Sequence, residues 1–171
     1  MEVKLGFGAV PRPQYVFVKK DNDHCWYMLA EDNRHIPVYE KALTGVITEI
    51  KVDRKVENTF SIDGKIKINL YVLADKPYII QSGNDTYFSK SLLLSLDAMT
   101  SEQLRNPLTI AVSPGNSNVV FCNIYDPVTY RFVGVSWDGH NEIDWQTLGQ
   151  KVSLKINKIK NLNQEPIQIS S

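Results

Sequence analysis

The stretch Gly45-Val46-Ile47-Thr48-Glu49-Ile50-Lys51-Val52-Asp53 decides the fold of this chain. Its side chains fall into two alternating sets, which are Val46, Thr48, Ile50 and Val52 against Ile47, Glu49, Lys51 and Asp53. A period of two places successive side chains on opposite faces of a sheet. The stretch therefore predicts a β-strand with one face inside the protein, and we expect the core to begin at Gly45.

Further strand-like runs follow toward the C-terminus, and one helix-like run interrupts them. Strands are expected over residues 66–73, 78–81, 108–112, 119–125, 130–137 and 151–157. Between Ser89 and Met99, leucines recur at helical spacing after serines that suit an N-cap, which predicts a short helix. The Asp63-Gly64 dipeptide is a strong turn signal before the second strand.

This order of elements is that of an OB-like Greek-key barrel, with its helix between the third and fourth strands of the barrel. We predict a mainly β fold with that barrel over residues 45–160, one short helix and a polar tail over 161–171. Residues 1–44 are expected to form an arm and a β-hairpin extension that packs on the barrel. Glycines and prolines between Val3 and Pro13 favour the arm, and turn residues between two β-rich runs favour the hairpin.

The composition is that of an ordinary soluble protein, because 43% of the 171 residues are hydrophobic and 22% are charged. No apolar run approaches the roughly 18 residues of a membrane span, and the first residues lack the apolar stretch of a signal peptide. A cytoplasmic location is therefore expected. Nineteen basic side chains balance nineteen acidic ones, so the protein has no overall field that would attract a polyanion. Cys25 and Cys122 are expected to be buried free thiols.

The sequence carries no motif for catalysis, and we predict a protein that is not an enzyme, with no catalytic residue and no cofactor. It lacks a nucleophile elbow and a phosphate-binding glycine loop. The loop Asp138–Asp144 holds three carboxylates and a histidine, but its spacing does not fit an EF-hand. The three histidines follow no zinc-ligand spacing, so no metal site is predicted.

Aromatic and basic side chains on the expected strands are the best functional signal. Proteins hold single-stranded nucleic acid by stacking bases on aromatic rings and by placing Lys or Arg at phosphates. The residues predicted to bind nucleic acid are Lys65, Lys67, Tyr71, Phe121, Tyr125, Tyr130, Arg131 and Phe132. The alternative is that these aromatic side chains cover a neighbouring strand, the N-terminal hairpin or another subunit. The acidic residues interleaved with the lysines, such as Glu49 and Asp53, favour that alternative.

The order of the runs resembles that of OB-fold single-stranded DNA-binding proteins. The pattern is carried by the strand-like runs 45–50, 66–73, 78–81, 108–112 and 119–125 and by the helical run 89–99. In such barrels a glycine like Gly45 permits the tight coil of the first strand. The resemblance implies that Tyr71, Phe121, Tyr125 and Phe132 stack on bases, while Lys65, Lys67 and Arg131 contact phosphates.

From the sequence we therefore expect a non-catalytic protein that binds single-stranded nucleic acid. It is expected to form a homo-oligomer whose subunits exchange the N-terminal arm, with no membrane partner. One alternative is a protein-interaction or assembly module that uses the same aromatic face. Another is an oligosaccharide-binding barrel, which would use the aromatic rings without the cations.

Overall fold

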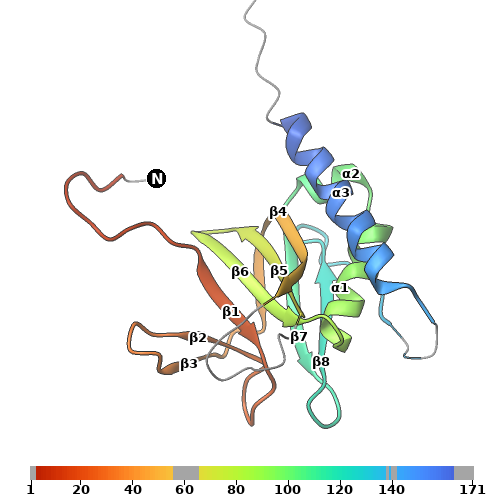
Figure 1. Ribbon diagram of the computed structural model, residues 1–171, viewed down its shortest axis with the longest axis horizontal. Coiled ribbons are helices and arrows are strands. Elements are labelled where there is room, and N and C mark those ends of the chain that lie inside the picture. The colour runs from red at the N-terminus through yellow and green to blue at the C-terminus, as the bar shows by residue number, and fades with distance from the viewer. Residues whose placement is uncertain (1–2, 56–65, 138, 140–141, 164–171) are drawn as a thin grey trace, which may run out of the picture.

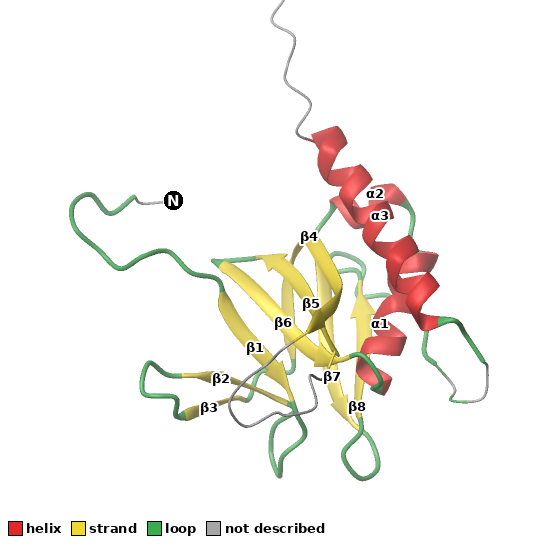
Figure 2. Ribbon diagram, viewed as in Figure 1, coloured by secondary structure: helices red, strands yellow, loops and turns green. Residues whose placement is uncertain are grey.

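The computed structural model describes residues 3–55, 66–137, 139 and 142–163 of the chain. Its elements are, in chain order, β1 (Gln14–Val18), β2 (Trp26–Leu29), β3 (His35–Val38), β4 (Ala42–Lys55), β5 (Ile66–Leu73), β6 (Pro77–Gly83), α1 (Tyr87–Ala98), α2 (Ser101–Arg105), β7 (Leu108–Pro114), β8 (Val120–Tyr125) and α3 (Trp145–Asn163). The strands form one eight-stranded sheet that curls into a half-barrel, and the helices gather on one side of it (Figures 1 and 2). The predicted mainly β class is therefore confirmed.

The strand order is β3-β2-β1-β6-β5-β4-β7-β8. The strands β4, β5 and β6 form an antiparallel meander, and β7 and β8 form an antiparallel hairpin. The N-terminal strand β1 pairs in parallel with β6, and β2 and β3 continue the sheet outward from β1. The N-terminal segment is thus a continuation of the same sheet as the strands that follow Ala42.

The long strand β4 serves two neighbours. Its first residues, Ala42–Gly45, pair with β7, and the rest of the strand pairs with β5 through two register shifts. Such bulges bend a strand and increase its twist, which lets one strand pass around the curve of the sheet. Gly45 lies at the crossing, where a Cβ atom would stand 2.6 Å from the carbonyl oxygen of Leu73. Only glycine permits this approach of two backbones.

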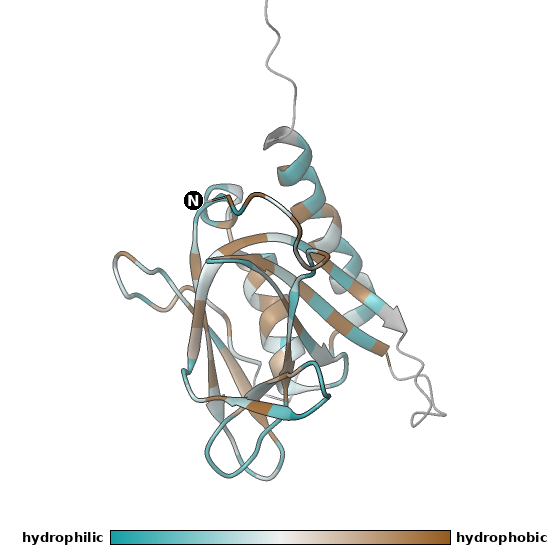
Figure 3. Cartoon of the chain, turned by 90° about the vertical axis from the view of Figure 1, so that its left-hand side faces the viewer, coloured by the Kyte–Doolittle hydropathy of each residue, from teal (hydrophilic) through white to brown (hydrophobic). Residues whose placement is uncertain are grey.

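The core lies inside the curl, against the helices. Alternate side chains of the strands point into it, as the alternating hydropathy along the strands shows (Figure 3). The helix α1 packs on β8 with Leu92 and Leu96 completely buried, and α3 packs on β4 and α1. The Lys155 ammonium of α3 donates to the carbonyl oxygens of Leu96, Asp97 and Met99, where α1 ends. Those carbonyls lack intrahelical partners, so Lys155 caps one helix from the other.

The predicted strand over 151–157 is wrong, because those residues lie in the middle of α3. Alternation of Val152, Leu154 and Ile156 suggested a period of two. The buried side chains are Val152, Ile156 and Ile159, at helical spacing, while Leu154 is 70% exposed. The expectation of one short helix is corrected with it, since the described residues contain three helices.

The strand predicted over 130–137 is also wrong. Within this run, the structure has a single bridge, between Phe132 and Tyr125. The segment instead crosses α1, where the Ser95 hydroxyl bonds both the amide and the carbonyl of Val135. The helix predicted from Ser89 begins earlier, at Tyr87, because Thr86 is its N-cap. No helix within the described ranges is both long and apolar enough to cross a membrane.

Candidate nucleic-acid interface

The structure divides the predicted binding residues into two groups. Lys67 and Tyr71 lie on β5, whereas Phe121 and Tyr125 lie on β8, and β4 and β7 stand between these strands in the sheet. Tyr130, Arg131 and Phe132 follow β8 in the chain and lie beside the second group. Lys65 lies outside the described residues.

The β5 group belongs to the face of the sheet that points away from the core. Residues paired across neighbouring strands share a face, so the registers define rows of side chains. One row runs from Glu49 through Tyr71 and Ile79 to Tyr15, and the next runs from Lys51 through Asn69 and Gln81 to Phe17. Four strands, β4, β5, β6 and β1, therefore present one continuous surface.

Stacked rings extend this surface onto β2 and β3. The centroids of the Tyr15 and Phe17 rings lie 5.8 Å apart, those of Phe17 and Tyr27 5.3 Å, and those of Tyr27 and His35 4.2 Å. The interplanar angles of these pairs are 14°, 29° and 9°. Phe17 and Tyr27 are stacked on both sides, whereas Tyr15 and His35 end the row. The row thus offers ring edges along its length and ring faces at its ends.

We call this surface the aromatic face; it comprises Tyr15, Phe17, Tyr27, His35, Lys51, Lys67, Asn69, Tyr71 and Gln81. The Gln81 Nε2 donates to the Asn69 Oδ1 at 3.0 Å. This hydrogen bond gives the Asn69 amide oxygen a partner, although Asn69 is only 1% exposed. Burial raises the pKa of the Tyr27 phenol above its ordinary value.

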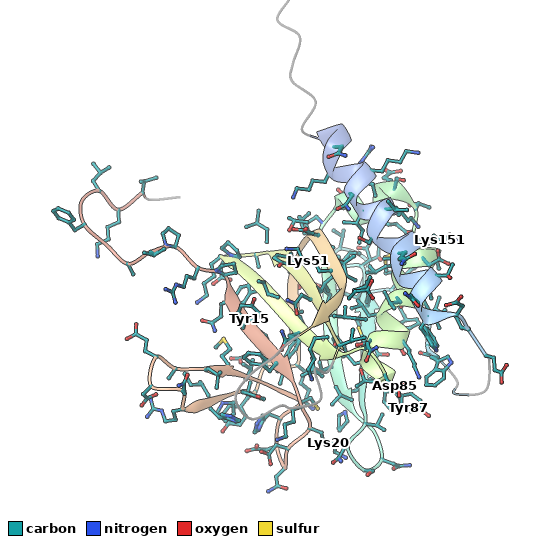
Figure 4. All side chains as sticks on the ribbon, in the orientation of Figure 1. Tyr15, Lys20, Lys51, Asp85, Tyr87 and Lys151 are labelled. Atoms are coloured by element: carbon teal, nitrogen blue, oxygen red, sulfur yellow. The ribbon has the colours of Figure 1, made fainter. Side chains whose placement is uncertain are left out.

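Charge on the aromatic face is mixed. The Lys51 Nζ lies 5.4 Å from the centroid of the Tyr71 ring, a cation–π distance that places the ammonium over the ring. Glu49 is paired with Tyr71 across the strands and brings a carboxylate to the same row. Figure 4 shows Tyr15 and Lys51 on the two outer strands of the β1-β6-β5-β4 stretch, with β6 and β5 between them. The face can therefore combine stacking with a few cationic contacts.

The second group, on and after β8, makes ring contacts but stays partly exposed, since Phe121 is 36% and Phe132 47% exposed. The Phe121 ring meets the Tyr87 ring of α1 edge-on at 5.8 Å, and the Tyr125 ring meets that of Phe132 at 5.7 Å. Tyr130 is 82% exposed and has a φ of 61° in the turn after Asp126. Backbone amides of Thr129 and Val128 bond the Asp126 carboxylate and lower its pKa. This turn explains why Tyr130 projects into solvent.

Another aromatic cluster holds the segment after β8 against α1. The centroid of the Trp137 ring lies 4.8 Å from that of Tyr87 and 5.5 Å from that of Trp145. The Lys90 ammonium lies over both indoles, 4.2 Å from the centroid of Trp137, and bonds Asp85 at 2.7 Å. Because Lys90 is already committed to these partners, this cluster stabilises the fold rather than offering a free cation.

Sequence reasoning missed the residues of β1, β2, β3 and β4 on the aromatic face, namely Tyr15, Phe17, Tyr27, His35 and Lys51. The alternation Tyr15-Val16-Phe17-Val18 did show that both rings share a face. What it did not show is the parallel pairing of β1 with β6, which carries those rings beside Tyr71 and Asn69.

Within the described ranges, no group of three or more His, Cys, Asp or Glu side chains is placed to hold a metal ion. The loop 138–144 is described only in part, since residues 138, 140 and 141 lie outside the described residues. Both cysteines are buried free thiols, and burial raises the pKa of each. Neither is therefore activated as a nucleophile.

Comparison of the chain with protein-family models, with curated proteins and with solved structures finds no match in any of the three.

Proposed function

We propose that the protein binds single-stranded nucleic acid on the aromatic face and performs no catalysis. The observation that carries the proposal is the continuous surface in which Tyr71, with Lys51 over its ring, stands in register with Tyr15 across β6. Aromatic rings supply stacking surface for bases of any identity, and ammonium groups beside them supply phosphate contacts. Lys67, on the same face of β5 as Tyr71, pairs with Gly83 in the ladder.

The proposal includes an OB-like interpretation of the fold. Strands β4 to β8, with α1 between β6 and β7 in the chain, would correspond to the five strands and the helix of an OB barrel. In that fold the second and third strands carry the ligand. Here these are β5 and β6, which lie at the centre of the aromatic face. The N-terminal strands would then enlarge the ligand surface of the barrel. The cytoplasmic location expected from the sequence belongs to the same proposal.

Fluorescence anisotropy tests the proposal directly. The probe is a labelled single strand of about thirty nucleotides, which exceeds a single site of about 4 to 16 nucleotides, with the matching duplex as control. We expect saturable binding that prefers the single strand. Binding should weaken with salt by a shallow slope of about −1.4 in log K against log salt, because two phosphate contacts release few counterions. Absence of binding at tens of micromolar protein would refute the proposal.

Point variants locate the binding surface. Tyr71→Ala removes a half-buried ring of the aromatic face, and we expect a loss of about 5- to 150-fold in affinity, which corresponds to about 1 to 3 kcal/mol for one stacked base. Tyr71→Phe keeps the ring and should bind nearly as well. The matched control is Tyr130→Ala, which removes the exposed ring of the second group. If only Tyr130→Ala weakens binding, the surface after β8 carries the ligand and the aromatic face does not.

The second candidate function is a protein-interaction or assembly module that uses the same face. The stacked row from Tyr15 to His35 favours it, because the inner rings of the row already pack against each other and another chain could cover their edges. The oligosaccharide-binding alternative would need the rings but not Lys51. A Lys51→Gln variant that binds a single strand normally would count against phosphate contacts on the face.

A further inference from the structure

The N-terminal arm, residues 3–13, carries apolar side chains that are mostly exposed. Val3, Leu5, Phe7 and Val10 are each at least 74% exposed. The first three alternate, so in an extended chain they share one face. The arm leaves the sheet at Gln14 and projects away from it (Figure 1). Such a row of exposed apolar side chains marks an interaction segment.

The same chain carries an apolar groove on its other side. It has a volume of about 200 Å³ and lies between β4, α2 and α3, lined by Val46, Ile47, Thr48, Leu104, Arg105, Ile156, Ile159 and Lys160. In Figure 1 the arm and the helices that form this groove lie on opposite sides of the molecule. Eleven extended residues reach roughly 36 Å. Pro11 and Pro13 favour an extended path outward at the base of the arm.

We propose that the arm of one subunit docks in the groove between β4, α2 and α3 of a second copy of this chain. A contact between the arm of one copy and the groove of the next joins two different surfaces, so it would link copies head to tail. The contact is apolar. The charged groups at it are cations on both sides, Lys4 and Arg12 on the arm and Arg105 and Lys160 on the groove.

This arrangement gives the self-association a distinctive salt dependence. The like charges repel each other at low salt, and salt screens that repulsion within a Debye length of about 10 Å at 0.1 M. Self-association should therefore strengthen as salt rises. Nucleic-acid binding on the aromatic face should weaken under the same change. The docking does not depend on the proposed function, and the opposite salt responses separate the two.

Sedimentation equilibrium of the full chain, without nucleic acid, tests the proposal. We expect a mass that rises with protein concentration beyond that of a single chain, and more steeply at 0.5 M than at 0.05 M salt. Phe7→Ser should weaken the association at least tenfold. The matched control is Val128→Ser, which removes another highly exposed apolar side chain, 84% exposed, from the turn after β8. A single-chain mass at all concentrations, or an equal effect of the two variants, would overturn the proposal.

Disulfide trapping tests the groove. A Leu5→Cys chain is mixed with a Thr48→Cys chain of different tag length under mild oxidation, and the mixed-size dimer is expected within minutes. The native thiols do not compete, because Cys25 and Cys122 are buried. Leu154→Cys, on the exposed side of α3, replaces Thr48→Cys in the control and should trap at least tenfold less. Equal trapping at Thr48→Cys and Leu154→Cys would overturn the proposal. A chain that carries both Leu5→Cys and Thr48→Cys provides a second test, and a disulfide that forms only within that single chain would overturn docking between two copies.

Discussion

Replacing Lys155 by Met should destabilise the protein, because this side chain links α3 to the end of α1. The Lys155 ammonium donates to three carbonyl oxygens at the end of α1, which are those of Leu96 at 3.1 Å, of Asp97 at 2.9 Å, and of Met99. Methionine keeps most of the apolar stem, so the change removes the charge and the donors but little packing. The α1 carbonyls lose their partners, and the negative end of the helix dipole loses its counter-charge.

The expected cost is about 2 to 3 kcal/mol of the free energy of unfolding. One hydrogen bond from a charged donor contributes about 1.5 to 3 kcal/mol, and three bonds from one half-buried ammonium do not add up in full because water can replace some of them. For a domain of 150 to 250 residues, each kcal/mol shifts the melting temperature by about 2 to 4 °C. We therefore expect a fall of roughly 4 to 12 °C.

Urea unfolding followed by circular dichroism, with thermal melts, measures both quantities. The control is Lys158→Met on the same helix, an exposed lysine whose replacement should change the free energy of unfolding by less than about 0.5 kcal/mol. The lysine Lys151 keeps its ion pair with Asp97 in both variants. If Lys155→Met costs no more than Lys158→Met, the capping of α1 by α3 contributes nothing to stability, and the reasoning is refuted.

Three further predictions concern backbone approach, thiols and a tyrosine. Gly45→Ala should lower the free energy of unfolding by about 1 to 3 kcal/mol in chemical denaturation, because a backbone carbonyl occupies the place of the new Cβ. Gly8→Ala, which would meet no atom within 4 Å, should have no effect. Equal effects of the two variants would contradict the close approach of the backbones at Gly45. Both cysteines should resist a thiol reagent in native protein and react after unfolding, and rapid native labelling of Cys122 would contradict its burial. Desolvation, with a smaller effect of Asp75, raises the pKa of Tyr78 from its ordinary value of 10.0 to about 12. The neutral Tyr78 phenol therefore contributes fully to stability below pH 10, and this contribution is lost as pH rises toward 12. The urea midpoint of the wild-type protein should therefore fall between pH 10 and 12, and Tyr78→Phe should reduce that fall. Identical pH profiles of the midpoint for the two proteins would contradict the prediction.

Local periodicity predicted most of the strands because one face of each is buried. The runs 66–73, 78–81, 108–112 and 119–125 lie within or largely within β5, β6, β7 and β8. It failed over 151–157, where the alternation of Val152, Leu154 and Ile156 fits a strand, but a window of seven residues is too short to exclude a helix. The burial of Ile156 and Ile159, on a helix that packs against β4, α1 and α2, distinguishes the helix from the strand. This burial depends on tertiary packing, which the local sequence pattern does not reveal.

The candidate site was predictable only in part for a related reason. Lys67 and Tyr71 were correctly assigned to one face, since alternation along a strand is local. Their neighbours Tyr15 and Phe17 come from about fifty residues earlier in the chain, through the parallel pairing of β1 with β6. A parallel pairing of such distant segments leaves no mark in the periodicity of either strand, so the sequence predicted only a hairpin extension that packs on the barrel.

The balance of charge restricts how the aromatic face could hold a nucleic acid. Nineteen acidic side chains cancel nineteen basic ones over the chain, and Glu49 stands in the row of Tyr71. A neutral protein gains little from counterion release, so most of its affinity would have to come from stacking. Stacking persists at high salt, and there the head-to-tail docking of the arm is strengthened too. We therefore expect this neutral protein to lose less affinity at high salt than proteins whose binding is driven by charge. High salt would also favour association of its subunits along the bound strand.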